Sequence, residues 1–369
     1  MKISLEREAL LRQLQTVSRV ASTRSAIQAL SGVQLAVQSS GCELRATDMD
    51  VGLRVPVEAE VIREGVVVLP ARLLLDVVRL LPAADVALEL RAAEQDVELV
   101  SGNATFHIRT LRAEDFPPFP EPEPASAVEL PVEAFVSTAL KVASSASRDE
   151  TRPVLTGILV SASDRELRMV ATDSYRLSVK ETVLETALPS GFEVNVPARA
   201  LQELARVAGH AEDEQLRISV RQNQILFELD GIILSSRLID GQFPNYRQLL
   251  PETFEHELRM VGSELTEVVR RISLLAQKNA PLRLSFTPGE LTISAQTPDS
   301  GEALESLPVS FQGEPLEIGF NPDFLRAGLE AIEEGDVVLK LISPLRPGLI
   351  ESGDESRFRY LIMPIRLNV

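Results

Sequence analysis

The most regular hydrophobic pattern in the chain is a helical stripe within Leu69–Leu81 (LPARLLLDVVRLL). Its apolar positions follow the spacing i, i+3, i+4, i+7, which is typical of a helix packed on a sheet. They are Leu74, Val77, Val78 and Leu81. Arg72 and Arg79 are seven residues apart, so they fall together on the opposite face of the predicted helix.

This helix occurs again later in the chain. Val196–Ala208 (VPARALQELARVA) repeats the apolar stripe 127 positions further on and places Arg199 and Arg206 outward. Phe320–Ile332 is a third, weaker copy that lacks both arginines, and Asn321 is its expected N-cap. Recurrence of one helix at a regular spacing predicts an internal repeat.

A second kind of helix precedes each of these copies. We expect it in Leu5–Arg19, Val132–Ser144 and Leu265–Leu275. Arg12 and Arg19 project from the outer face of the first of these helices.

Alternating segments between and after the helices predict strands buried on one side. They are Val33–Gln38, Ile158–Ala162, Leu282–Phe286, Val86–Leu90, Val97–Ile108, Leu216–Leu238 and Val337–Leu367. Turn residues predict hairpins at Thr287–Glu290 and Arg221–Gln224. Each unit therefore has the predicted order helix, strands, helix, strands, which is an α+β domain with two helices on antiparallel sheets.

Division of the 369 residues by three gives units of about 123 residues. We expect domains at 1–120, 129–250 and 256–369, with linkers at 121–128 and 251–255. The first connector, Asp115–Pro131, has six prolines and four acidic residues, and we expect it to join neither neighbouring element. Similar units joined in similar ways curve, and three that form a half circle would close as a dimer into a ring of six.

The composition excludes several classes of protein. Aromatic residues make up 4% of the chain and Trp is absent, which argues against recognition by base stacking. A net charge of −17 argues against general affinity for nucleic acid, so any such binding needs segregated positive charge. The single cysteine, Cys42, excludes an internal disulfide, and we expect it to be a small buried residue of a strand. No long apolar run or signal peptide is present, which predicts a cytoplasmic protein without membrane association.

The sequence gives little support for a catalytic site. Asp48 and Asp173 recur in Ala-Thr-Asp triplets, which we interpret as structural turns in which the carboxylate binds its own backbone. His107, His210 and His256 lie in different units without metal-ligand spacing. The nucleophile-elbow, phosphate-loop and dinucleotide motifs are absent. We therefore predict neither a catalytic site nor a metal or cofactor.

Two apolar segments with basic companions carry the remaining functional signal: Val170–Ser178 (VATDSYRLS) and Tyr360–Val369 (YLIMPIRLNV). Chain ends are usually polar, so an apolar end is either an inner strand or one wall of a groove for short hydrophobic peptides. The pattern alone leaves both readings open.

With these segments in view, the sequence resembles the bacterial sliding clamps, the beta subunits of DNA polymerase III. The motifs that carry the resemblance are MKISLERE at the start, LRATD (44–48), residues 69–81, LTG (155–157), ATDSYRL (171–177), LIDGQFPNY (238–246), IGFN (318–321) and MPIRL (363–367). The resemblance implies the DNA clamp fold: a homodimeric ring of six similar domains, threaded by duplex DNA, that tethers the replicative polymerase without catalysis. Partners implied are the polymerase alpha subunit, the clamp loader and repair proteins, bound through short hydrophobic motifs.

The resemblance also implies roles for individual residues. DNA contacts would be made by Arg24, Arg72, Arg79, Arg152 and Arg199. Pro153 and Val154 stand where some members have a tyrosine pair that contacts DNA. The dimer interface would involve Phe106, Ile108 and Leu274.

The family's partner pocket maps onto two runs and several single residues. Its predicted lining is Leu155, Thr172, Ser174, Tyr175, Arg176, Leu177, Pro244, Leu249, Asn321, Phe324, Leu345, Met363, Pro364, Ile365, Arg366 and Leu367. Ser174 and Tyr175 replace the Gly and His of some members, and Gln248 stands where an Arg can occur. A different peptide preference is therefore expected.

Three alternatives stay open. A scaffold of the same fold could bind peptides without encircling DNA, as the uneven arginines and missing tyrosines would allow. The chain could also be a clamp variant that tolerates an inhibitor. A hydrolase or deaminase is a third, more distant reading.

Overall fold

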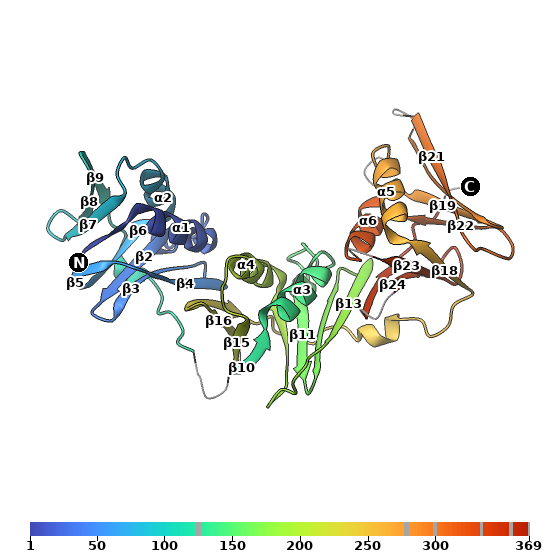
Figure 1. Ribbon diagram of the computed structural model, residues 1–369, viewed down its shortest axis with the longest axis horizontal. Helices are drawn as coiled ribbons and strands as arrows, with labels where there is room; N and C mark the ends of the chain where they lie inside the picture. The colour runs from blue at the N-terminus through green and yellow to red at the C-terminus, as the bar shows by residue number, and fades with distance from the viewer. Residues whose placement is uncertain (123–126, 277–279, 298–300, 333–334, 354–356, 368–369) are drawn as a thin grey trace. The chain divides into compact units, whose positions relative to one another are not determined.

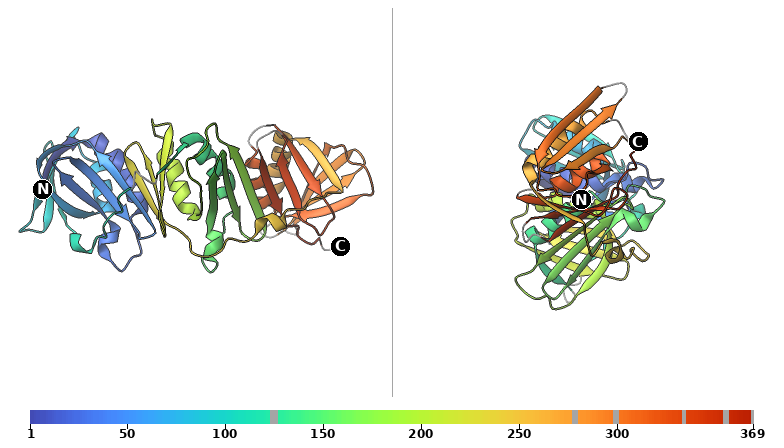
Figure 2. Two further views of the ribbon diagram at one scale, coloured as in Figure 1. Left: turned by 90° about the horizontal axis from the view of Figure 1, so that it is seen from below. Right: turned by 90° about the vertical axis from the view of Figure 1, so that its right-hand side faces the viewer.

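The computed structural model describes residues 1–122, 127–276, 280–297, 301–332, 335–353 and 357–367. The chain forms two compact units: Met1–Val132 with Glu203–Leu238 (unit 1), and Glu133–Gln202 with Ile239–Val369 (unit 2). Figure 1 shows their elements in chain order, and Figure 2 shows them from two further sides. Of the expected linker 121–128, residues 123–126 lie outside the described part.

Three repeats make up these units, and they share one element order apart from an additional strand, β5, in the first. The first contains β1 (Lys2–Glu6), α1 (Arg7–Val17), β2 (Gly32–Gln38), β3 (Gly41–Thr47), β4 (Val51–Val57), β5 (Glu60–Arg63), β6 (Gly65–Pro70), α2 (Ala71–Arg79), β7 (Asp85–Arg91), β8 (Asp96–Ser101) and β9 (Ala104–Arg109). The second contains β10 (Val128–Pro131), α3 (Val132–Ala143), β11 (Gly157–Ser163), β12 (Glu166–Thr172), β13 (Arg176–Val183), β14 (Phe192–Pro197), α4 (Ala198–Ala208), β15 (Gln215–Val220), β16 (Gln224–Leu229) and β17 (Ile232–Arg237). The third contains β18 (His256–Val261), α5 (Gly262–Ser273), β19 (Leu282–Thr287), β20 (Glu290–Thr297), β21 (Gly301–Pro308), β22 (Leu316–Phe320), α6 (Pro322–Glu330), β23 (Asp336–Leu341), β24 (Gly348–Ser352) and β25 (Phe358–Ile362).

The predicted α+β class, with two helices and antiparallel strands in each repeat, is confirmed. The predicted order was wrong at one point, because each repeat begins with a strand. Leu5, expected in the first helix, lies in β1, where Ile3 and Leu5 are buried and Lys2 and Ser4 are partly exposed. The alternation of buried and exposed residues in β1 is a strand pattern, and it is hard to separate from the helical stripe that follows directly. β1 pairs with β5 and β7.

Unit 1 is built on two sheets. A five-stranded sheet has the order β5-β1-β7-β8-β9, and an eight-stranded sheet has the order β10-β15-β16-β17-β4-β3-β2-β6. In the larger sheet β17 of the second repeat pairs antiparallel with β4 of the first, through Ile233–Arg54 to Ser236–Val51. The first two repeats therefore share one continuous hydrogen-bonded sheet.

Unit 2 follows the same plan. Its eight-stranded sheet has the order β14-β11-β12-β13-β25-β24-β23-β18, and its four-stranded sheet has the order β21-β20-β19-β22. Here β25 of the third repeat pairs with β13 of the second, from Arg176–Ile362 to Lys180–Phe358. The two junctions follow one rule. In each, the third strand after the second helix of one repeat pairs with the third strand after the first helix of another repeat.

The helices bury the predicted stripes. In α2 Leu74 and Val78 are buried, as is Leu81 just beyond the helix, while Arg72 and Arg79 are exposed as expected. Leu73 and Leu80 are also exposed, at 49% and 82%, which the stripe did not predict. In α6 the Asn321 carboxamide accepts hydrogen bonds from the N–H groups of Asp323 and Phe324, so the predicted N-cap is confirmed. No helix within the described ranges is long and apolar enough to cross a membrane.

Cys42 lies in β3 and is buried, as predicted. Burial raises the pKa of its thiol to about 12, and the neighbouring Glu43 carboxylate acts in the same direction. The thiol is therefore protonated and enclosed at neutral pH.

The Pro-rich connector is more structured than expected. Val128–Pro131, predicted to join no element, forms β10 and pairs with β15 at the edge of the eight-stranded sheet. An edge position tolerates Pro131, since a strand there needs fewer N–H donors. Phe116 packs with Ala29 and Val68 in a small buried cluster.

Close packing of α6 on β25 leads to a stability prediction. A Cβ atom on Gly328 would lie 2.5 Å from the buried Tyr360 ring. Overpacking costs about 1–3 kcal/mol, while the better helix propensity of Ala recovers about 1 kcal/mol, so we expect Gly328→Ala to lower the thermal midpoint.

The matched control is Gly209→Ala, where the new Cβ would have ordinary contacts at 3.6 Å. Calorimetry of both variants compares them directly. Equal midpoints for the two would contradict the packing described here.

Candidate functional site

A tight turn between β12 and β13 begins the candidate site. The Asp173 carboxylate Oδ1 accepts hydrogen bonds from the N–H groups of Tyr175 (2.9 Å) and Arg176 (3.0 Å). In the first repeat Asp48 Oδ1 accepts from Asp50 (3.1 Å) and Val51 (2.9 Å) in the same way. The prediction that both Ala-Thr-Asp triplets are structural turns is therefore confirmed.

The turn holds Ser174 in an uncommon conformation. Its φ is +79°, in the left-handed region that favours glycine. The Arg152 guanidinium donates from Nη1 to the Ser174 hydroxyl at 3.1 Å, and its Nε donates to the Asp149 carboxylate at 3.0 Å. A serine side chain thus obtains a contact here that a glycine could not make.

Beside this turn lies an open cavity of about 460 Å³ in unit 2. The turn, the 3-10 helix η6 (Tyr246–Leu249) and the segment before β24 form its walls. Its residues are Thr172, Ser174, Tyr175, Arg176, Leu177, Gln248, Leu249, Leu250, Pro251, Leu345, Arg346, Pro347, Leu361 and Met363. Leu177 and Leu361 are buried at its base, while Leu249, Leu345 and Met363 are exposed at 49%, 64% and 41%. The exposed apolar side chains make a surface suited to hydrophobic ligands.

The structure brings half of the predicted pocket residues together around this cavity. Those that line it are Thr172, Ser174, Tyr175, Arg176, Leu177, Leu249, Leu345 and Met363. Those outside its lining are Leu155, Pro244, Asn321, Phe324, Pro364, Ile365, Arg366 and Leu367. The other lining residues are Gln248 of η6, Leu250 and Pro251 directly after it, Arg346 and Pro347 before β24, and Leu361 of β25. The abundance of Leu and Pro in these segments was the available signal.

Arg176 connects the turn to the third repeat. Its Nε donates to the Asp173 carboxylate at 3.0 Å, and its guanidinium carbon lies 4.4 Å from the centre of the Phe324 ring. The Tyr360 hydroxyl donates to the Phe324 carbonyl at 2.8 Å. Burial raises the pKa of Tyr360 to about 12, so this donor stays protonated. Phe324 also stacks on Tyr175, which lines the cavity, with ring centres 6.5 Å apart.

The apolar segment Tyr360–Val369 was expected to be either an inner strand or one wall of a groove, and its described residues take part in both. The Met363 N–H donates to the Tyr175 carbonyl at 2.8 Å, and Met363 lines the cavity. Ile365 forms a bridge to Gly319 of β22. A Cβ atom on Gly319 would lie 2.7 Å from Leu367, so glycine is required for this close approach. The segment thus extends a sheet at Ile365 and supplies a groove wall at Met363.

The predicted DNA contacts are distributed over both units. Arg24, Arg72 and Arg79 are exposed in unit 1, and Arg152 and Arg199 are exposed in unit 2. Arg79 makes an ion pair with Asp76 at 3.4 Å, which leaves half of its side chain accessible. Arg152 lies at the cavity turn, where its guanidinium donates to Ser174 and Asp149.

The predicted dimer residues lie on the edge strand β9 and at the end of helix α5. Phe106 on β9 is 39% exposed and Leu274, directly after α5, is 82% exposed. Ile108 is only 3% exposed, so its side chain belongs to the core and only its backbone is available to a partner strand.

Comparison with known proteins gives one consistent result. Family models of the DNA polymerase III beta subunit match the chain in sequence: the N-terminal domain at residues 1–120, the central domain at 129–245 and the C-terminal domain at 247–366. The chain is 33% identical to the beta sliding clamp of Streptomyces coelicolor, over 100% of both proteins.

Solved structures agree over the whole length. The DNA polymerase sliding clamp from Bacillus subtilis superposes with a TM-score of 0.93 at 27% identity, covering 100% of both chains. A sliding clamp from Pseudomonas aeruginosa bound to griselimycin superposes with a TM-score of 0.89 at 30% identity, again over 100% of both chains.

The turn predicts a local effect of Asp173→Ala. Loss of the acceptor leaves two backbone N–H groups and Arg176 without their partner, at a cost of about 1–3 kcal/mol. We expect faster amide hydrogen exchange at residues 174–176 and a distorted cavity.

Asp48→Ala in the first repeat is the control, because it opens the equivalent turn away from the cavity. Exchange at residues 174–176 should respond only to the change at Asp173. Unchanged exchange there would show that the carboxylate does not hold the turn.

Proposed function

The chain belongs to the DNA polymerase III beta subunit family, the beta sliding clamps, and we propose how its residues perform the clamp's processivity function. In this proposal two copies form a ring around duplex DNA, and the cavity of unit 2 tethers the replicative polymerase. The supporting observation is that both junctions between repeats pair strands in equivalent positions. Two further strands in those positions end their sheets and lack such a partner within the described residues.

The unfilled strands are β9 and β21. β9 is the third strand after α2, as β17 and β25 are after α4 and α6, and β21 is the third strand after α5, as β4 and β13 are after α1 and α3. Within the described residues each ends its sheet without the pairing that its counterparts make. Exposed edges invite pairing with another chain. If β9 of each copy pairs with β21 of the other copy, every equivalent strand has a partner. The two chains then close into a ring of six domains.

The side chains fit this pairing. Phe106 lies on the same face of β9 as the buried Ile108, and Glu305 on β21 makes an ion pair with Arg271 of α5. The Glu305 face of β21 is thus covered by α5, and the Phe106 face of β9 is the one that carries buried Ile108. In the dimer we expect Phe106 to meet Leu274 at the end of α5, where both exposed apolar side chains become buried.

DNA would be held by phosphate contacts alone. Arg24, Arg72, Arg79, Arg152 and Arg199 are exposed, and contacts of guanidinium groups to phosphate carry no sequence information. Retention then depends on the closed ring, and weak contacts allow sliding. Such a role needs no bond-making step, so we propose no enzymatic activity for this chain.

The cavity of unit 2 is proposed as the partner site. Its exposed leucines and Met363 suit short hydrophobic motifs, and Arg176, Gln248 and Ser174 offer polar anchors. The proposed partners are the polymerase alpha subunit, the clamp loader and repair proteins. Predicted residues outside the cavity lining, such as Phe324 and Ile365, would support its walls. We propose domains at 1–120, 129–250 and 256–369, and a cytoplasmic location where chromosomal DNA is accessible.

Retention on DNA tests the ring. The protein should have a mass near twice 40.4 kDa in solution. Once loaded on nicked circular DNA by its clamp loader, it should remain bound at moderate salt and dissociate when the circle is cut. Gel filtration of the radiolabelled complex measures both.

The control is Phe106→Glu with Leu274→Glu, which places acidic side chains at the proposed interface. This variant should be monomeric and absent from both DNA forms. Equal retention of the unaltered protein on linear and circular DNA would refute encirclement.

The cavity is tested by Leu249→Ala with Met363→Ala. Both are exposed apolar residues of its lining, and truncation of a contact that dominates binding typically costs more than about 1 kcal/mol. We expect stimulation of polymerase synthesis to fall at least about tenfold.

Leu80→Ala is the matched control, because Leu80 is exposed but lies in unit 1 away from the cavity. Both proteins should remain dimeric. Full stimulation by the Leu249/Met363 variant would show that the partner site lies elsewhere.

A further inference from the structure

The cavity of unit 2 carries a positive charge that its own walls do not neutralise. Two arginines line it, Arg176 and Arg346, and the described lining contains no Asp or Glu. The chain as a whole has a net charge of −17, so this balance is unusual for its surface. A binding site with excess positive charge favours acidic ligands over basic ones. The two arginines differ in how far their charge is available.

Arg176 is committed to the protein. Its Nε donates to the Asp173 carboxylate at 3.0 Å, its Nη1 to the Tyr360 hydroxyl at 3.5 Å and its Nη2 to the Ser144 carbonyl. The side chains of Arg176 and Asp173 are each only 13% exposed. The charge of Arg176 is therefore balanced within the fold.

Arg346 is exposed, and its guanidinium has no hydrogen-bond or ion-pair partner in the part of the chain that the structure describes. Its backbone is held in place, because its N–H donates to the Ser343 carbonyl at 3.2 Å and closes a turn around Pro344 and Leu345. Pro347 follows directly, and proline at both places restricts the backbone. A fixed turn thus presents the 64% exposed Leu345 and the cationic Arg346 to one cavity.

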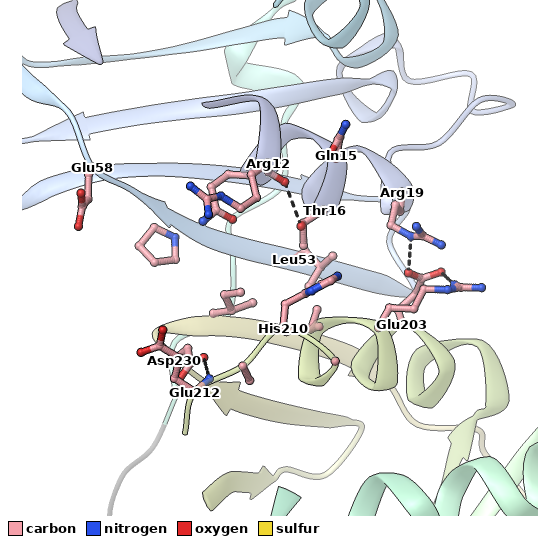
Figure 3. A pocket seen from close by; sticks show the side chains of 17 residues that line it. Arg12, Gln15, Thr16, Arg19, Leu53, Glu58, Glu203, His210, Glu212 and Asp230 are labelled. Atoms are coloured by element: carbon pink, nitrogen blue, oxygen red, sulfur yellow. Dashed lines mark hydrogen bonds and ion pairs between the residues drawn. The ribbon is translucent and has the colours of Figure 1, made fainter. Parts of the chain in front are cut away.

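The large cavity of unit 1 shows the opposite balance (Figure 3). Three arginines line it together with four carboxylates. The Glu203 side chain there is only 9% exposed, and its Oε2 accepts from Arg19 Nε at 2.9 Å. Its other oxygen accepts from Arg206 Nη1. Basic charge in that cavity is neutralised by the chain itself, so the uncompensated arginine is a particular feature of the cavity in unit 2.

We propose that Arg346 is a specificity-determining residue of the partner cavity, and that it binds an acidic side chain next to the apolar residues of the partner's motif. This inference rests on the proposed function, in which the cavity holds short hydrophobic motifs. Leu249, Leu345 and Met363 take the apolar residues, and Arg346 pairs with the carboxylate. A guanidinium binds a carboxylate through two parallel hydrogen bonds, so the contact selects for geometry as well as charge.

The exposure of Arg346 sets the size of the effect. An exposed ion pair adds modestly to affinity and acts mainly on the choice between partners. We expect an acidic residue at the matching position to bind about fivefold more tightly than its neutral amide. The preference should weaken as salt rises, because exposed charges are screened.

The test measures how octapeptides of Leu, Phe and Ser displace a fluorescent hydrophobic peptide from the full-length dimer. One Asp, Asn or Lys is placed at each position in turn. All peptides are acetylated and amidated, so the Asp side chain is the only carboxylate. Competition anisotropy gives each affinity. At the position that meets Arg346, Asp should bind about fivefold more tightly than Asn, and Lys should bind most weakly.

Variants of Arg346 assign the preference to this side chain. Arg346→Gln should abolish the preference for Asp over Asn, and Arg346→Glu should reverse the order so that Lys binds best. Arg346→Lys should keep part of the preference, since it retains the charge without the planar fork. A preference for Asp that survives Arg346→Gln would overturn the role of Arg346.

Arg283→Gln is the charge-matched control. Arg283 belongs to unit 2, has 42% of its side chain exposed, pairs with Glu317 and lies outside the cavity lining. Its variant should keep the full preference for Asp. Equal loss of the preference in the Arg283 and Arg346 variants would show a general effect of net charge and overturn the proposal.

Leu249→Ala with Met363→Ala separates this inference from the proposed function. If that variant loses all the peptides while the unaltered protein shows no preference for Asp at any position, the role of Arg346 fails and the partner cavity stands. If the unaltered protein binds none of the peptides, or the double variant binds them as tightly, the partner cavity fails and this inference fails with it.

Discussion

Pairing of sheet edges between repeats is the interaction on which the rest of this structure depends. β17 with β4, and β25 with β13, convert separate half sheets into continuous eight-stranded sheets. Backbone hydrogen bonds fix the register of one repeat against the next, and the cavity of unit 2 lies at one such junction, where Arg176 and Leu177 face Ile362 and Leu361. The candidate functional surface thus depends on how repeats join and not on any single repeat.

The two kinds of recognition are built from different parts of the fold. The arginines proposed to contact phosphate include exposed residues of helices, as Arg72, Arg79 and Arg199 are. The partner cavity is made from turns, a 3-10 helix and connectors. Helix faces repeat regularly and suit a uniform ligand, while loops vary freely and suit diverse partners. A net charge of −17 leaves the helix arginines as local exceptions in an acidic molecule.

Hydrophobic periodicity predicted the helices, the strands between them and the α+β class, because residues buried on one face recur at a regular spacing in the sequence. It missed β1 and β10, since four- or five-residue strands give little signal beside a strong helical stripe or a run of prolines. Asp48 and Asp173 were interpreted correctly because a turn is local. The network of Arg176, Phe324 and Tyr360 joins residues up to 184 positions apart, and no local pattern encodes it. The Glu203 bridge between Arg19 and Arg206 was missed for the same reason: only folding brings the first two repeats together.

The environment of Cys42 has a practical consequence for spectroscopy. It is the only cysteine of the chain, and its thiol is enclosed in β3 with a pKa of about 12. Maleimide and iodoacetamide reagents attack thiolates, so the natural chain offers them almost no target in the folded state. A cysteine introduced at an exposed position would then accept a fluorophore or spin label selectively, without replacement of the native residue.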